Sequence, residues 1–342
     1  MVRRPLLLAL AAITLMPLIA TNSASASAGA RGWHRSRFSS PNLSVSAMAY
    51  DANTKQLIGF GGCAPLFPTC TPSRVTLNLG AHGWIKLHPT SQPSARWTSM
   101  AYDPATRQLL LFGGYSETDG YFNDTWTWTG STWRRLHPKS SPSARRDQMM
   151  AWDPSTRQML LFGGCSDESS FCTTGCLSDT WLWTGRNWHQ ASPSVSPPCR
   201  YSGGLAYSPL GKQLILFGGW ASDGAFYNDT WAWTGVNWKE LDPVTSPPAR
   251  GRFVMATDPI SGNIIVFGGF AWTCADTLCG DTWAWNGVTW YSVPTKVAPT
   301  PRSDSVMAVD PRYRSLVLIG GDANPPSYAQ TWLWGFGRRG VA

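Results

Sequence analysis

The sequence predicts an all-β fold, a six-bladed β-propeller, from three observations. The first is a repeat: six Gly-Gly pairs each end a short apolar run and begin at Gly61, Gly113, Gly163, Gly218, Gly268 and Gly320. The second is the period of 50 to 55 residues, which suits one four-stranded blade. The third is composition: 33 Gly, 26 Pro and only 14% charged residues favour a turn-rich β protein and exclude disorder, collagen and coiled coil.

The first residues have the pattern of a secretory signal peptide. Arg3 and Arg4 make a basic start, residues 6–20 form an apolar run, and small residues that suit cleavage follow at 24–28. The apolar run is shorter than the roughly 20 residues of a membrane span. We therefore predict a signal peptide at residues 1–28, a propeller at residues 29–342, and a secreted, extracellular protein without a membrane span.

The second unit shows how one blade is built. Its four expected strands are residues 96–102, 108–112, 124–128 and 133–137. Asp-Pro between the first two favours a tight turn, and the Gly-Gly pair lets the chain turn where a side chain would clash. The third strand, Asp-Thr-Trp-Thr-Trp, places two Trp on one face, where they can fill the gap between blades. Sixteen of the 20 Trp occupy such repeated positions, so we expect them to serve packing. The Asp of the Asp-Thr-Trp motif is also repeated, and we expect it to cap a turn.

The sixth unit stops at its third strand, so its fourth strand must come from elsewhere. Residues 32–35, Gly-Trp-His-Arg, match the outer strand that contains Trp133. We therefore expect the segment around Trp33 to pair beside residues 330–334 and close the ring. Closure removes the open sheet edges that invite aggregation.

An apolar run that ends in Gly-Gly, followed by an aromatic strand and a further Trp, resembles the kelch repeat over essentially the whole mature chain. The resemblance implies a kelch-type propeller. Kelch propellers include protein-binding modules, sugar isomerases and the copper enzyme galactose oxidase, so the resemblance implies no single activity. The likeness to galactose oxidase concerns its propeller only.

The histidines argue against copper oxidation. A copper site of the galactose oxidase type needs Tyr, His and Cys together near the channel. All five His are expected in or beside outer strands, away from the channel: His34, His82, His88, His137 and His189. We therefore predict no metal and no other cofactor.

All eight Cys fall in loops that open on one face of the expected propeller: Cys63, Cys70, Cys165, Cys172, Cys176, Cys199, Cys274 and Cys279. Eight Cys in an exported chain favour disulfides over a metal site. We expect two local disulfides, Cys63–Cys70 and Cys274–Cys279. The other four Cys leave three connectivities open. Stiffened loops around a channel mouth would form a pre-organised binding face.

Two sets of residues on this face are candidates for ligand binding. Trp220 and Trp272 follow Gly-Gly pairs in the loops, where exposed rings would suit stacking on sugars; loop packing is the alternative. Arginines recur at the entry to every blade after the first: Arg96, Arg145, Arg200, Arg250 and Arg302. They could form a basic ring that binds a carboxylate or a sulfate. The alternative is that each guanidinium binds backbone carbonyls of the neighbouring blade, and the repeat favours this second interpretation.

The first strands also carry residues that depart from the repeat. One residue in each blade lies five positions before the last residue of the first strand. These residues are Val45, Trp97, Asp147, Ser202, Arg252 and Asp304. We expect these positions to lie near one mouth of the channel, with Trp97 as a further binding candidate. Asp147, Asp304 and Arg252 would be the catalytic groups of an enzyme; solvated, paired charges are the alternative.

These observations predict a non-catalytic, monomeric binding protein for a glycan, an anionic partner or an extracellular protein. The alternative is a carbohydrate-active isomerase or lyase, and a third interpretation is a structural module of the cell envelope. The net charge is +8, but no run of Lys and Arg exceeds two residues, so we expect no nucleic-acid partner.

Overall fold

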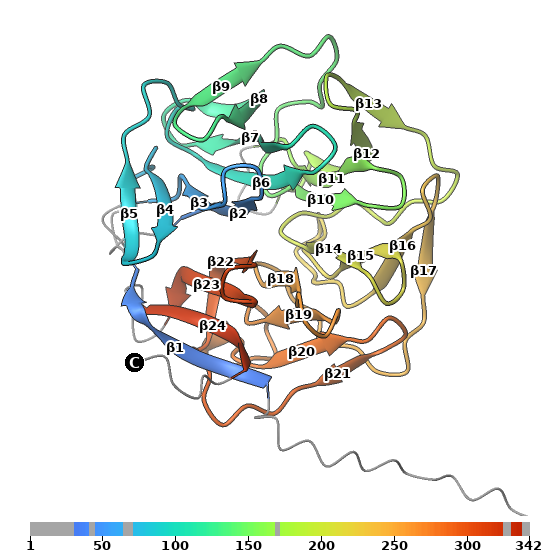
Figure 1. Ribbon diagram of the computed structural model, residues 1–342. Helices are drawn as coiled ribbons and strands as arrows, with labels where there is room; N and C mark the ends of the chain where they lie inside the picture. Colours follow the sequence, from blue (N-terminus) through green and yellow to red (C-terminus); the bar gives the residue numbers. More distant parts are fainter. Residues whose placement is uncertain (1–30, 41–44, 64–70, 168–171, 324–329, 337–342) are drawn as a thin grey trace, which may run out of the picture.

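The computed structural model describes residues 31–40, 45–63, 71–167, 172–323 and 330–336. Their strands form six four-stranded sheets that stand around a central axis (Figure 1). The predicted all-β, six-bladed propeller is therefore confirmed. The helical element in these ranges is a 3-10 turn, η1 (Ala275–Thr277). No helix within this part of the chain is long and apolar enough to cross a membrane.

Consecutive strands of each blade pair antiparallel, from the inner strand to the outer one. Blade one contains β2 (Ala47–Asp51), β3 (Gln56–Phe60), β4 (Thr76–Gly80) and β5 (Gly83–Leu87). Blade two contains β6 (Trp97–Asp103), β7 (Gln108–Ser116), β8 (Gly120–Trp128) and β9 (Trp133–Leu136). Blade three contains β10 (Met149–Asp153), β11 (Gln158–Cys165), β12 (Cys176–Trp183) and β13 (Trp188–Ala191).

The second half of the ring repeats this plan. Blade four contains β14 (Gly204–Ser208), β15 (Gln213–Phe217), β16 (Thr230–Trp233) and β17 (Trp238–Leu241). Blade five contains β18 (Val254–Thr257), β19 (Ile264–Phe267), β20 (Thr282–Trp285) and β21 (Trp290–Ser292). Blade six contains β22 (Arg302–Asp310), β23 (Ser315–Ala323), β24 (Gln330–Phe336) and, from the other end of the sequence, β1 (Arg31–Ser39).

The N-terminal strand closes the ring, as predicted. β1 pairs antiparallel with β24, with Trp33 opposite Trp334, and the two strands lie side by side in Figure 1. The Trp33 side chain is buried and packs on Phe267 of blade five, with ring centroids 5.0 Å apart. The outer strand of the last blade thus ties the two ends of the sequence together.

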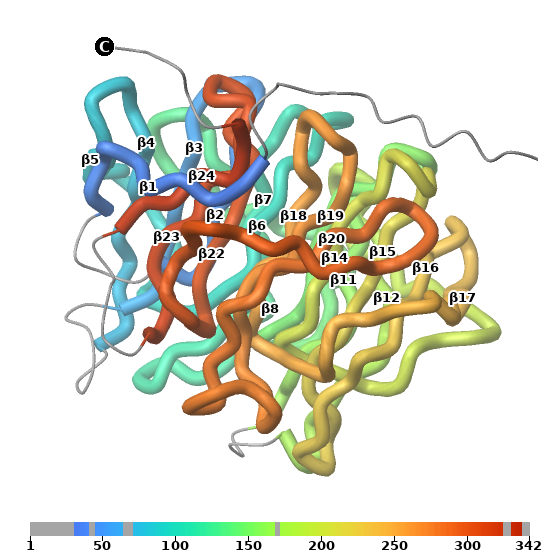
Figure 2. The backbone as a smooth tube through the Cα atoms, turned by 90° about the horizontal axis from the view of Figure 1, so that it is seen from below, coloured from blue at the N-terminus to red at the C-terminus, as the bar shows by residue number. Residues whose placement is uncertain are grey.

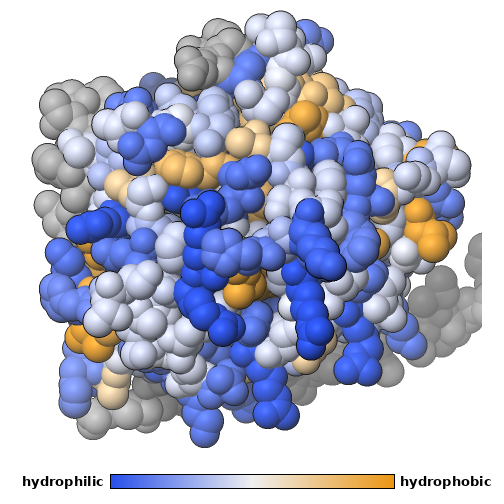
Figure 3. Space-filling view, turned by 90° about the horizontal axis from the view of Figure 1, so that it is seen from above, coloured by the Kyte–Doolittle hydropathy of each residue, from blue (hydrophilic) through white to orange (hydrophobic). Residues whose placement is uncertain are grey.

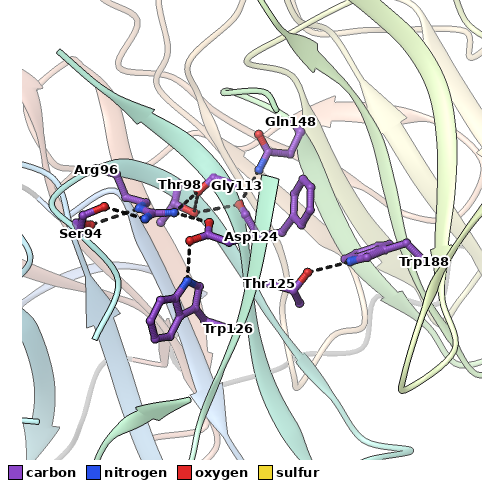
Figure 4. Close-up of polar contacts among 10 residues, drawn as sticks. Ser94, Arg96, Thr98, Gly113, Asp124, Thr125, Trp126, Gln148 and Trp188 are labelled. Atoms are coloured by element: carbon purple, nitrogen blue, oxygen red, sulfur yellow. Dashed lines mark hydrogen bonds and ion pairs between the residues drawn. The ribbon is translucent and has the colours of Figure 1, made fainter. Parts of the chain in front are cut away.

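One hydrogen bond recurs at every junction between blades. The outer-strand Trp of a blade donates its Nε1 to the Thr hydroxyl in the third strand of the preceding blade, at 2.9 or 3.0 Å. The six pairs are Trp84–Thr331, Trp133–Thr76, Trp188–Thr125, Trp238–Thr180, Trp290–Thr230 and Trp33–Thr282. Both groups are buried in most pairs, so a lost partner would leave a buried polar atom unsatisfied. Figure 4 shows the Trp188–Thr125 pair.

The recurring arginines are buried inside the blades. Arg96 is 1% exposed, and its guanidinium donates to the Gly113 carbonyl at 3.4 Å and to Asp124 at 2.5 Å (Figure 4). The indole of Trp126 donates to the same carboxylate at 2.8 Å. Arg145, Arg200 and Arg250 make the equivalent pairs with Asp179, Asp229 and Asp281, whereas in blade six Gln330 occupies the acidic position. The Asp of the Asp-Thr-Trp motif, expected to cap a turn, is instead the counter-ion of a buried arginine.

The same arginines explain the Gly-Gly pairs. The Gly164 amide donates to the main-chain carbonyl of Arg200, the entry residue of the next blade, at 2.9 Å. Gly163 has a φ of 63°, and a Cβ there would lie 2.5 Å from that carbonyl oxygen. The side chain of Arg200 meanwhile holds the Gly218 carbonyl of its own blade at 3.1 Å. The backbone of each arginine thus bonds the preceding blade and its side chain bonds its own, which corrects the expectation that the guanidinium would reach the neighbour.

The two faces of the ring differ in their connections. The turns between first and second strands lie on one face, and the longer loops after the Gly-Gly pairs project from the other, at the bottom of Figure 2. The side of the ring at blades two and three is largely hydrophilic, with only scattered apolar residues (Figure 3). Scattered apolar residues of this kind are normal on a protein surface.

Substitution of Trp33 tests the closing strand. We expect Trp33→Ala to lower the free energy of unfolding by about 3–5 kcal/mol, because it opens a cavity and removes the donor to Thr282. Trp272, which is 64% exposed, is the control, and Trp272→Ala should change stability by less than about 0.5 kcal/mol. Urea denaturation of both variants measures this. Equal midpoints would contradict a role of β1 in closing the ring.

Substitution of Asp179 tests the buried ion pairs. Burial acts to raise the pKa of Asp179, but the hydrogen bonds and charge of Arg145, with the indole of Trp181, outweigh it and hold the pKa below 3.8. The ionised Asp179 therefore makes its full contribution to the free energy of unfolding above pH 3.8. This contribution is lost as the pH falls through the lower pKa of the folded state. At pH 7, Asp179→Asn should destabilise the protein by about 3 kcal/mol, because it leaves a buried guanidinium without its counter-charge.

The matched control is Asp242→Asn, which removes the same charge from an exposed position. Denaturant titrations at pH 7, 5 and 3 should show a gap between Asp179→Asn and the natural protein that narrows only below pH 3.8. A gap that is constant over this range would show that the ionised carboxylate is not what stabilises the blade.

Candidate functional site

A cavity of about 530 Å³ opens at one mouth of the channel, on the face of the Gly-Gly loops. All six positions that depart from the repeat in the first strands line it: Val45, Trp97, Asp147, Ser202, Arg252 and Asp304. The structure therefore brings together residues that are spread over some 260 positions of sequence, one from each blade. This is the site that the sequence pattern picked out by position.

Four of these residues have a left-handed backbone, and we call them the left-handed residues. In blades three to six, one more residue than in blade two separates the buried arginine from the end of the first strand. The extra residue takes a left-handed conformation, with φ between 53° and 57°, at Asp147, Ser202, Arg252 and Asp304. In blade six, Ser303 pairs with Asp322 and Ser305 with Gly320, so the register of the two strands is the same on both sides of Asp304. All four left-handed residues line the cavity.

The left-handed residues are bonded to one another around the mouth. The amides of Ser202, Arg252 and Asp304 donate to the carbonyls of Asp147, Ser202 and Arg252 respectively, at 2.8 to 3.0 Å. Each bond joins two neighbouring blades. The backbone that carries the polar side chains is thus fixed before any ligand arrives, which lowers the entropic cost of binding.

Two ion pairs lie in the cavity. An Arg252 Nη lies 3.5 Å from the Asp304 carboxylate, and an Arg146 Nη lies 2.5 Å from that of Asp147. The negative charge of Asp304, and that of Asp147 beyond it, raises the pKa of Arg252 against the opposing effect of burial. Both pairs remain partly exposed to the cavity, so their spare donors and lone pairs can reach a polar ligand.

Aromatic rings form one wall of the cavity. Trp97 stacks on Tyr115, with ring centroids 6.3 Å apart and planes inclined by 16°, and Tyr115 contacts Tyr121 at 4.8 Å. The Tyr121 hydroxyl accepts from Arg146 Nε at 3.2 Å and donates to the Asp167 carbonyl. The rings therefore stand directly beside the ion pairs, and a ligand in the cavity would contact both.

The sequence argument missed Asp322, Arg146, Tyr121 and Glu117, which also line the cavity. One signal was available: Asp322 directly follows Gly320-Gly321, just as Tyr115 follows the pair in blade two. Burial, and then the charge of Asp304, raises the pKa of Asp322 above its usual range, although Arg252 opposes this. The carboxylates of Asp304 and Asp322 thus have different surroundings, because Asp304 is paired with Arg252 whereas Asp322 is mainly affected by burial.

The two loop tryptophans have different surroundings. Trp220 is 6% exposed and packs against Tyr201, Phe226 and Phe270, so loop packing describes it. The Arg252 guanidinium lies 5.1 Å from its ring centroid, so Trp220 supports the cavity from below. Trp272 is 64% exposed and contacts Phe270, which leaves its outer face open to solvent.

The five recurring arginines are not among the described residues that line the cavity. Arg96, Arg145, Arg200, Arg250 and Arg302 are each at most 1% exposed, and their guanidiniums bond groups inside the blades. Binding of an anion by these groups would require the blades to open. Their geometry is that of a scaffold for the cavity.

Disulfides staple the loops of this face. The described bonds are Cys165–Cys172, Cys176–Cys199 and Cys274–Cys279, which selects one of the three connectivities left open for the first four. The expected Cys63–Cys70 bond involves residue 70, outside the described residues. Asp167 lies near Cys165 and Cys172, but the two sulfurs are bonded to each other and offer no thiolate to a metal. The three bonds are consistent with an extracellular protein.

Comparison with known proteins agrees with the repeat. The family described as the KLHDC2/KLHL20/DRC7 Kelch-repeats domain matches residues 44–241, more than half of the 342-residue chain. No curated protein matches the chain. The narrower likeness to the galactose oxidase propeller stays a prediction. With six blades of this repeat around one channel, the chain belongs to the kelch-repeat family.

Proposed function

We infer that this protein is an exported binding module. It holds a glycan in the channel-mouth cavity, on the face whose loops carry the disulfides. Membership of a kelch-repeat family indicates an interaction module. The observation that carries the finer proposal is the pairing of an aromatic wall, Trp97 with Tyr115, and ion-paired polar groups within one cavity. Export is part of the proposal and rests on residues 1–28.

The charges of the cavity favour a neutral glycan over the anionic partner that the sequence left open. Arg252 and Arg146 are each already paired with a carboxylate. Asp322 and Glu117 add further acidic groups to the lining. An anion would meet more carboxylates than guanidiniums, whereas sugar hydroxyls can both donate to the carboxylates and accept from the guanidiniums.

The aromatic wall suits the other part of a sugar. A pyranose ring has a face of C–H groups, which packs on the face of an aromatic ring while the hydroxyls at its edge form hydrogen bonds. The backbone bonds among the left-handed residues hold the polar groups in place. The contacts of Tyr115 with Trp97 and Tyr121 hold the aromatic wall. The cavity, at about 530 Å³, has the size of ordinary small-ligand sites, about 300–1,000 Å³.

A glycan-array screen of the oxidised protein tests this proposal. We expect binding to a defined set of neutral glycans, and an affinity at least about tenfold lower in Trp97→Ala, because the stacking face is lost. Tyr291→Ala is the matched control, since Tyr291 is an exposed aromatic residue on the outer strand β21. Trp272→Ala tests whether the glycan binds in the cavity or at the exposed loop beside it. If Trp272→Ala loses glycan affinity and Trp97→Ala does not, the binding site is the loop that carries Trp272.

Retention of no glycan at all would contradict the proposal, and so would equal losses in Trp97→Ala and Tyr291→Ala. The interaction surface would then be one for a protein partner. Correct folding of each variant is checked by its denaturation midpoint, because Trp97 is only partly buried and its removal should leave the blade intact.

The carboxylates give a second candidate, an acid–base enzyme that acts on sugars. Asp304 faces Arg252, whereas the pKa of Asp322 is raised by burial and by Asp304. A carboxyl group with a raised pKa, such as that of Asp322, can serve as an acid, and a second carboxylate nearby can serve as a base. Asp147, Arg252 and Asp304, the catalytic candidates of the sequence, would then be joined by Asp322.

Turnover of the glycans retained on the array distinguishes the two candidates. For an enzyme, we expect Asp322→Asn to lower kcat by about 100-fold or more while glycan affinity changes little, because an acid catalyst is removed without loss of the aromatic wall. Product analysis by mass spectrometry with natural protein and variant measures this. Unchanged glycans after incubation with the natural protein would leave the binding module as the function.

A further inference from the structure

A second cavity lies on the opposite face, where the ring closes. Its volume is about 560 Å³, and it is bounded by β1, by β24 and by the turn between β22 and β23. It lies at the turn end of the blades, away from the Gly-Gly loops and the channel-mouth cavity. None of the described residues that line it belongs to the site proposed above.

The rim of this cavity is basic. Arg35, Arg37 and Arg314 line it together with His34, and no carboxylate is among the described lining residues. Arg35 and Arg314 are exposed, and the ion pairs found within the described part of the chain include neither of them nor Arg37. The nearby arginines differ: Arg31 is paired with Asp258.

The basic groups are close enough to affect one another. The pKa of Arg31 is lowered, first by burial and in part by the positive charge of Arg314, although Asp258 opposes this. Arg37 lies over the ring of Phe38, with its Cζ 5.0 Å from the centroid. A concentration of positive charge beside a cavity raises the local concentration of anions.

The interior of the cavity is apolar. Phe38 and Tyr313 lie 6.5 Å apart between ring centroids. The other apolar lining residues are Leu79, Ile260, Leu333 and Phe336, with Ser36 and Ser315 beside them. Contact of these apolar groups with a small hydrated ion contributes no favourable binding free energy. Contact with a hydrocarbon chain or ring does, because apolar surface is removed from water. The cavity therefore combines an apolar interior with a cationic rim.

We propose that this ring-closure cavity binds an amphipathic carboxylate, a molecule of the fatty-acid class, with its chain among Phe38, Ile260 and Leu333 and its carboxylate between Arg37 and Arg314. Charge complementarity selects the head group, because three arginines meet no acidic group in the lining. The apolar interior selects the tail. The volume, about 560 Å³, lies within the usual range of small-molecule sites, about 300–1,000 Å³.

Calorimetric titration of the full-length, oxidised protein with three probes tests both halves of this proposal. Dodecanoate carries the chain and the charge, dodecan-1-ol carries the chain alone, and acetate carries the charge alone. We expect dodecanoate, below its micelle concentration, to bind at least about tenfold more tightly than either of the others. Its affinity should also fall as salt is raised from 50 to 500 mM, because screening weakens the partly exposed charges.

Arg314→Gln and Arg37→Gln test the head-group contacts. Each should weaken dodecanoate binding about fivefold to tenfold, as expected for the loss of a charge-assisted hydrogen bond. The matched control is Arg107→Gln. Arg107 occupies the same position of the first turn in blade two, with a φ of 56° against 50° for Arg314, so both substitutions act on the same backbone conformation.

Three results would overturn the proposal: no binding of dodecanoate, equal affinity for dodecanoate and dodecan-1-ol, or an equal loss in Arg107→Gln and Arg314→Gln. Binding to vesicles that contain anionic lipid, without binding of monomeric dodecanoate, would also overturn it and would indicate a membrane-docking surface. Glycan binding at the channel mouth is measured on the same variants and should not change, so the two proposals stand or fall separately.

Discussion

The fold depends first on one buried hydrogen bond, from the outer-strand indole of each blade to a threonine hydroxyl of the preceding blade. The bond recurs six times and returns to its start, because Trp33 at one end of the sequence reaches Thr282 and Trp84 reaches Thr331. An unsatisfied indole or hydroxyl in a buried junction costs more than a typical hydrogen bond gains, so the ring tolerates little change at either position. Blade one illustrates this: it lacks both tryptophans of the third-strand motif but keeps Thr76.

The buried arginines extend this constraint to the channel mouth. The main chain of Arg200 bonds blade three while its guanidinium bonds blade four, so the chain between blades is held at both ends. One added residue shortly after such an arginine takes a left-handed conformation without a change of strand register. Its side chain then lines the cavity at the mouth, as that of Ser202 does. The scaffold therefore fixes where variable side chains appear, and the sequence is free to choose which they are.

Much of the fold was predictable because it depends on repetition, which is visible in one sequence. The spacing of the Gly-Gly pairs predicted the number of blades. The absence of an outer strand from the sixth unit indicated that the segment around Trp33 replaces it. The positions five residues before the ends of the first strands predicted the six residues at the channel mouth. Partners that lie apart in the sequence were less visible. The pairing of Arg145 with Asp179, 34 residues apart, turned an expected turn cap into a counter-ion. The burial of Trp220 depends on Tyr201, on Phe226 of the same loop and on Phe270 of blade five. Asp322 stood outside any pattern of charge.

The distribution of charge matters more than its sum. A net charge of +8 on its own favours anionic partners, yet the channel mouth holds Arg146 and Arg252 against the carboxylates of four acidic residues. At the ring-closure cavity, by contrast, Arg35, Arg37 and Arg314 meet no acid among the described lining residues. This follows from the architecture, because the left-handed residues bring charged groups of both signs to the mouth, whereas the closing strand brings arginines to the opposite face. The two faces of one propeller can therefore select ligands of different charge.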